Sequence, residues 1–141
     1  MTVKELIKRV RKENMIVKHK EDELYRLKTL CGVSGISYGG EKGSGSRNIN
    51  KNEQSYLKYI TFKDELNIYI GKAIENRRKL MALIDTLDNH IEIDVMYKYC
   101  IENYTIGMIA DEMNYSRQAV HKTYIKAIEK MEKDYTEVDK S

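Results

Sequence analysis

The hydrophobic positions of residues 1–31 recur at the spacing of an α-helix. They include Val3, Leu6, Ile7, Val10, Val17, Leu24, Leu27 and Leu30. Thr2 and Glu5 stand at the spacing of a capping box, in which the first side chain caps the helix and the second reaches back. The stretch from Arg11 to Glu23 is strongly charged and less regular. Residues 1–31 therefore predict an N-terminal helical segment, formed by one long helix or two shorter ones.

The helical pattern stops at residues 32–50, which read GVSGISYGGEKGSGSRNIN. Gly32 is suited to end the preceding helix, because glycine adopts the left-handed conformation common just past a helix C-terminus. A phosphate-binding loop would need a preceding strand and a GK[ST] or GxGxxG pattern, and none of these is found here. We therefore expect residues 32–50 to form a flexible linker.

A second helical pattern covers residues 51–88 and carries a heptad repeat. Its repeating positions are Tyr59, Leu66, Ala73, Leu80 and Leu87. Ile70 and Ile84 occupy the intervening row, whereas Lys63 and Arg77 interrupt it. The pattern predicts a coiled-coil-like arm that packs against the N-terminal helix or against another subunit. The aromatic residues of this segment favour packing over base stacking; they are Tyr56, Tyr59, Phe62 and Tyr69.

Residues 89–133 predict a separate C-terminal domain. The heptad breaks at residues 88–90, a third helix follows over residues 91–102, and residues 103–104 form a turn. The remainder of this domain has the pattern of two short helices joined by a tight turn. Residues 134–141, at the end of the chain, are expected to form a disordered tail.

The two helices at the end of this domain have clear start and stop signals. Thr105 is placed to cap the first helix, and Ala110 is the small residue at which two such helices approach closely. Asn114 suits the left-handed backbone of a tight turn. We expect the ring of Tyr115 to enter the core, and Ser116 to cap the second helix.

The helix after Ser116 has one apolar face, formed by Val120, Tyr124, Ala127, Ile128 and Met131. Its polar residues concentrate at the N-terminal end, which enters the major groove of DNA in helix-turn-helix proteins. Arginine can pair with guanine and glutamine with adenine through two hydrogen bonds each, while lysine suits phosphates. Backbone amides at both helix N-termini can also donate to phosphates. The predicted DNA-binding residues are Thr105, Ser116, Arg117, Gln118, His121, Lys122 and Lys126.

Composition narrows the remaining function classes. The chain has no proline and 33% charged residues, which suits long helices, and its net charge of +3 is only mildly basic. Cys31 and Cys100 lie far apart and show no metal-ligand spacing, so we expect reduced cysteines, no metal and no cofactor. No segment has the pattern of a signal peptide or transmembrane helix, which predicts a cytoplasmic protein. No catalytic constellation indicates an enzyme.

Residues 104–131 resemble the −35-binding domain (region 4) of sigma factors. The matching positions are Tyr104-Thr105, Ile109-Ala110, Asn114-Tyr115, Ser116, Val120 and Ala127-Ile128. In its order of helix, Ser/Gly-rich break, long helix and sigma-like unit, the chain is similar to small phage-encoded regulators of the ArpU/RinA type. Gly107 and Met108 depart from the family pattern. Because a helical glycine costs about 1 kcal/mol relative to alanine, we expect a short or soft first helix.

These observations predict an all-α protein, with a long helical hairpin or coiled-coil-like arm followed by a C-terminal helix-turn-helix. The predicted function is sequence-specific binding of double-stranded DNA. The resemblance implies transcriptional regulation, often of late phage or prophage genes, with RNA polymerase as a candidate partner. We expect a homodimer or higher oligomer through the long helices. Two alternatives stay open: a small terminase-like subunit that recognises DNA for packaging, and a helical oligomeric adaptor protein.

Overall fold

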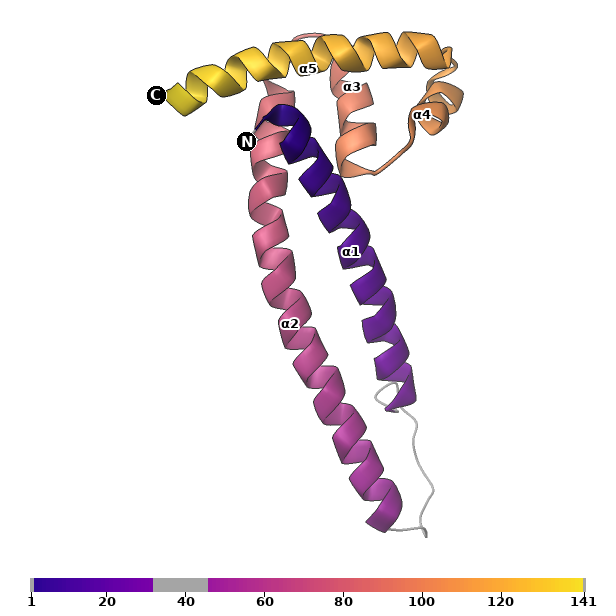
Figure 1. Cartoon of the computed structure of the whole chain (residues 1–141). Helices are drawn as coiled ribbons and strands as arrows, with labels where there is room; N and C mark the ends of the chain where they lie inside the picture. Colours follow the sequence, from indigo (N-terminus) through magenta and orange to yellow (C-terminus); the bar gives the residue numbers. More distant parts are fainter. Residues whose placement is uncertain (1, 32–45, 141) are drawn as a thin grey trace. The chain divides into compact units, whose positions relative to one another are not determined.

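The computed structural model describes the backbone of residues 2–31 and 46–140, and the side chains of residues 2–31 and 53–135. All regular elements in this part of the chain are helices, and the part holds no strand (Figure 1). In chain order they are α1 (Val3–Leu30), α2 (Ser46–Asp85), α3 (His90–Met96), the π-helical segment η2 (Tyr97–Ile101), α4 (Ile106–Met113) and α5 (Arg117–Lys140). The predicted all-α fold class is confirmed.

In the N-terminal half of the chain, the structure decides one open alternative and moves one predicted boundary. α1 is one continuous helix from Val3 to Leu30, which settles the choice between one helix and two. α2 begins at Ser46, so residues 46–50 of the predicted linker are helical. The rest of that linker, residues 32–45, lies outside the described residues.

The C-terminal half differs in two further places. The helix predicted over residues 91–102 is α-helical only as far as Met96, because it widens into η2 from Tyr97. α5 continues through residues 134–140, so the predicted disordered tail is wrong for this stretch. Tyr135 gives a physical reason, since its partly buried side chain packs against the apolar core and extends the buried face of α5.

The chain divides into two compact units. We call residues 16–71 the arm, and residues 1–15 together with residues 72–141 the head. The head is larger than the predicted domain of residues 89–133, because the beginning of α1 and the end of α2 fold with it.

The arm pairs the later part of α1 with the earlier part of α2. Tyr59 and Leu66, two of the heptad residues, are buried. The ammonium group of Lys20 lies 5.7 Å from the ring centroid of Phe62 and 5.7 Å from that of Tyr69. Tyr59 and Leu66 therefore pack within the arm as their heptad spacing predicts, and the rings of Phe62 and Tyr69 contact α1 as expected of packing residues.

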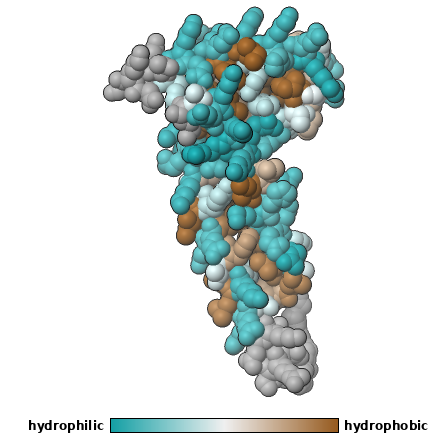
Figure 2. All heavy atoms as spheres, in the orientation of Figure 1, coloured by the Kyte–Doolittle hydropathy of each residue, from teal (hydrophilic) through white to brown (hydrophobic). Residues whose placement is uncertain are grey.

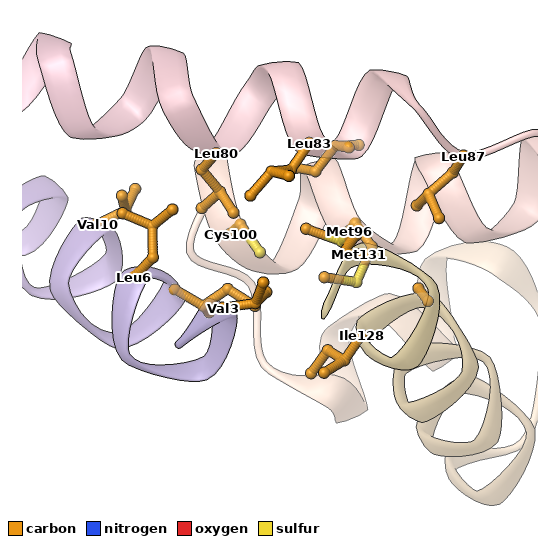
Figure 3. Close-up of a cluster of buried hydrophobic side chains, with 13 residues drawn as sticks. Val3, Leu6, Val10, Leu80, Leu83, Leu87, Met96, Cys100, Ile128 and Met131 are labelled. Carbon is orange, nitrogen blue, oxygen red and sulfur yellow. The ribbon is translucent and has the colours of Figure 1, made fainter. Parts of the chain in front are cut away.

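One large apolar cluster forms the core of the head. Its buried members are Val3, Leu6, Ile7, Val10, Leu80, Leu83, Ile84, Leu87, Met96, Cys100, Ala127, Ile128 and Met131. Figure 3 shows the labelled side chains converging from α1, α2, α3, η2 and α5. The helical spacing of residues 3–10 places one apolar face of α1 in this core, so the start of the chain is part of the same unit as its end.

Polar contacts also hold the start of α1 on the head. The side-chain amide of Asn14 donates to the carbonyl of Cys100 and to Oδ1 of Asn103, each at 3.0 Å. The Asn103 amide donates in turn to the carbonyl of Arg11, at 2.9 Å. The Arg11 guanidinium carbon lies 3.9 Å from the centre of the Tyr99 ring. These contacts support the turn before α4, where Asn103 has a φ of 60°.

Candidate nucleic-acid interface

α4, a short turn and α5 form a helix-turn-helix whose ends are closed by local hydrogen bonds. Oγ1 of Thr105 accepts from the amide of Met108 at 3.1 Å, which caps α4. Asn114 ends α4 in the left-handed conformation, with φ 58° and ψ 40°. Oγ of Ser116 accepts from the amide of Ala119 at 3.1 Å and caps α5. The predicted roles of these three residues in the turn and caps are confirmed.

A second apolar cluster joins α3, α4 and α5. Its buried members are Val95, Ile109, Ala110 and Val120. The rings of Tyr99 and Tyr124 pack edge to face beside it, with centroids 4.8 Å apart. Burial raises the pKa of Tyr124 far above its ordinary value, so this phenol stays neutral.

The predicted position of Tyr115 is wrong. Its side chain is 43% exposed, although its amide donates to the carbonyl of Ala110 at 3.0 Å. The left-handed residue before it turns the backbone so that the amide of Tyr115 faces α4 while the ring stays outside. Tyr99 and Tyr124 pack against the cluster in the way expected of Tyr115.

The predicted DNA-binding side chains of α5 are all on the protein surface. Arg117, Gln118, His121 and Lys122 are exposed and line one shallow depression together with Ile106 of α4. Lys126 is exposed further along the helix, where it lines a different depression with Lys4 and Lys130 among others. Figure 2 shows hydrophilic side chains over the outer surface of α5, with apolar residues between them.

Thr105 and Ser116 offer a ligand fewer free groups than the side chains of Arg117, Gln118, His121 and Lys122 do. Their hydroxyl oxygens already accept hydrogen bonds from their own helices, at 3.1 Å in both cases. What remains for a ligand at these two positions is the group of backbone amides in the first turn of each helix.

Charges around the helix-turn-helix are paired on one side. The ammonium of Lys98 lies 2.8 Å from the carboxylate of Asp94 and 3.4 Å from that of Glu112. Lys130 contacts the carboxylate of Glu92 at 2.8 Å, and the Glu92 side chain is only 5% exposed. The ion pairs of the described residues do not include the cations of Arg117, Lys122 or Lys126. The charges of Arg117 and Lys122, in the first two turns of α5, are therefore available to an anionic ligand.

The sequence analysis missed two features of this surface, the exposure of Ile125 and the contact between Gly107 and Arg117. Ile125 is 36% exposed and lies one turn after Lys122, on the same side of α5 as Gln118. A helical wheel finds this position, because it falls opposite Val120 and its apolar neighbours. Gly107 lies directly against the guanidinium of Arg117, and no sequence pattern indicates this contact because it joins two different helices.

No helix in the described part of the chain is long and apolar enough to cross a membrane. The described residues also contain no group of three or more His, Cys, Asp or Glu side chains that could hold a metal ion. Cys31 and Cys100 are both free thiols, and burial raises the pKa of Cys100 to about 12.

The fold and the capped helix pair define an all-helical protein with a helix-turn-helix in its head. Residues 33–132 match the family described as "Protein of unknown function (DUF1492)", and the chain belongs to this family. The match covers α2 to most of α5 and leaves out α1, whose first turns complete the core of the head. No curated protein and no solved structure matches the chain.

Proposed function

We propose that this protein binds double-stranded DNA in a sequence-specific manner and regulates transcription. The observation that carries the proposal is the first two turns of α5. They present Arg117, Gln118, His121 and Lys122 together on an exposed surface, on a helix that is capped by Ser116 and fixed by the burial of Val120. A rigid helix with donors at its N-terminal end is what reading the edges of bases in the major groove requires.

The side chains divide by chemistry into base readers and phosphate contacts. Arg117 and Gln118, at the very start of α5, read guanine or adenine through paired hydrogen bonds. Lys122 and Lys126 contact phosphates, as do the backbone amides in the first turns of α4 and α5. The exposed side chain of Ile125 supplies an apolar contact for a thymine methyl group.

The regulatory role draws on the resemblance of residues 104–131 to region 4 of sigma factors, and of the whole chain to phage-encoded regulators of the ArpU/RinA type. On this basis the protein acts in the cytoplasm on late phage or prophage genes, with RNA polymerase as a second partner. The helix-turn-helix supplies the operator contact, while other surfaces remain available for the transcription machinery.

Self-association through the arm belongs to the same proposal. Tyr25, Leu57 and Ile68 of the arm are 73%, 63% and 64% exposed. Apolar side chains this exposed on two helices favour packing against a second copy. A dimer would place two α5 helices on half-sites separated by one helical turn of DNA or a multiple of it.

The test is a binding selection on random duplex DNA at about physiological salt, which suppresses contacts made only to phosphates. We expect the protein to enrich one motif, and the double variant R117A/Q118A to bind that motif about 10- to 100-fold more weakly. The matched control is Q54A/R78A, which makes the same two changes at exposed positions of α2. Equal binding by both double variants would contradict the assignment of α5 as the recognition helix.

The selection also separates the other candidate functions. A terminase-like packaging subunit would select DNA but form a large ring in solution and leave transcription in vitro unchanged. A helical adaptor would form an oligomer and enrich no sequence. Light scattering on the same sample distinguishes these outcomes from a dimeric regulator.

A further inference from the structure

Gly107, the second residue of α4, lies directly beneath the side chain of Arg117. A Cβ atom added to Gly107 would lie 3.1 Å from Nη2, 3.2 Å from Nε and 3.3 Å from Cζ of that arginine. Three atoms of the guanidinium group at nearly equal distances mean that its plane lies against α4 rather than pointing one end at it. These distances are shorter than ordinary van der Waals contact, so a Cβ at position 107 would require the guanidinium to move by a few tenths of an ångström.

The backbone at position 107 gives no other reason for a glycine. Gly107 lies within α4 and its φ is not in the left-handed region that favours glycine. Within a helix, glycine is less stable than alanine. The contact with Arg117 is therefore the feature of this position that distinguishes glycine from alanine.

Gly71 provides a comparison within the same chain. It is also a helical glycine, in α2, but an added Cβ there would meet no atom within 4 Å. Alanine at either position improves the helical preference of the backbone, yet only alanine at position 107 would disturb another side chain.

We infer that Gly107 is a positioning residue for Arg117. Because Gly107 has no side chain, the guanidinium lies flat against the backbone of α4, and we call this contact the seat of Arg117. The seat lies at the edge of the depression lined by Ile106, Gln118 and His121. An arginine held in one orientation loses less conformational freedom when it binds than one that moves freely. The consequence for DNA reading rests on the proposed function, whereas the seat itself is a property of the free protein.

The first readout needs no DNA. The Nε–Hε signal of Arg117 in an NMR spectrum reports the environment and mobility of the guanidinium group. In G107A we expect this signal to shift toward that of a free arginine and its heteronuclear NOE to fall, while in G71A both stay as in the wild type. An unchanged Arg117 signal in G107A would overturn the inference, regardless of the affinity for DNA.

The second readout is affinity for the selected DNA site. We expect G107A to bind it about 2- to 10-fold more weakly, the range that corresponds to ordering one long side chain. G71A should bind like the wild type. Both alanine variants should unfold at a temperature equal to or above that of the wild type, because alanine favours the helix. Weaker binding by a protein that is no less stable separates positioning from damage to the fold.

A double-mutant cycle assigns the effect to Arg117. In the R117A background, adding G107A should change the affinity by less than about twofold, because the group that Gly107 positions is already gone. The inference is overturned if G107A lowers the affinity as much in the R117A background as in the wild type. It is also overturned if G107A leaves the affinity of the wild type unchanged while R117A alone lowers it. Either result leaves the proposed function intact. If the wild type selects no DNA, the proposed function fails and the NMR readout alone decides on the seat.

Discussion

Replacing Leu6 by alanine tests whether the head depends on the start of α1. Leu6 is 1% exposed and belongs to the cluster that contains Leu80 of α2 and Met131 of α5. Leucine-to-alanine changes at fully buried sites lower the free energy of unfolding by about 2–5 kcal/mol, through lost burial and the cavity left behind. Leu6 lies in the first turn of α1, where the chain can partly close over the gap. We therefore expect L6A to lower the free energy of unfolding by about 3 kcal/mol.

The assay is urea unfolding followed by circular dichroism and by tyrosine fluorescence, with thermal unfolding as a second measure. A loss of about 3 kcal/mol should lower the melting temperature by about 10–15 °C for a chain of this size. L30A is the matched control, because it makes the same change in the same helix at a residue that is 64% exposed. Its effect should stay within about 0.5 kcal/mol.

Equal losses of stability in L6A and L30A would contradict the burial of Leu6 in the core of the head. Equal small losses would mean that residues 3–10 do not share the core of the head in solution. Equal large losses would mean that the cost arises from the helix itself rather than from burial of its apolar face. Only a large loss in L6A beside a small one in L30A supports the packing in Figure 3.

Three shorter predictions concern other groups. K122A should lower the affinity for all DNA sequences alike and reduce the slope of log affinity against log salt by about 1, as measured by titration at several salt concentrations. K130A should lower the free energy of unfolding by about 1–2 kcal/mol, because it leaves the carboxylate of Glu92 buried without its partner; equal urea midpoints for K130A and wild type would contradict this. Iodoacetamide at pH 8 should modify Cys31 but not Cys100 in the folded protein, since burial shields Cys100 and raises its pKa to about 12; mass spectrometry counts the labels, and urea should expose the second thiol.

The helix-turn-helix was predictable because its signals are local. Thr105 and Ser116 cap the helices that follow them, and Asn114 supplies the left-handed turn, so each is determined by residues within one turn of the helix. The apolar stripe of α5 is likewise a matter of helical spacing, which assigns Val120 to the core and leaves Lys122 exposed.

The features that could not be predicted depend on partners distant in the chain. The aromatic ring of Tyr115, beside a turn, favours burial. However, Tyr99 and Tyr124 pack against the cluster around Val120, and the ring of Tyr115 stays exposed. Within the sequence of α4, Gly107 only weakens the helix. Its contact with Arg117 of the next helix becomes visible only in the packed structure. Neither the periodicity nor the spacing of residues contains such information, because packing between elements determines which side chain fills a given space.

The head combines residues from distant parts of the chain. Its helix-turn-helix lies near the C-terminus, but the core beneath α5 is completed by residues 3–10. The carboxylate of Glu132 on α5 also accepts a hydrogen bond from the amide of Val3, at 3.1 Å. α1 then continues without a break into the arm, so one helix contributes to both units. The core beneath the helix-turn-helix therefore depends on residues far apart in the chain, which is why the stability of the head should depend on Leu6 as well as on α4 and α5.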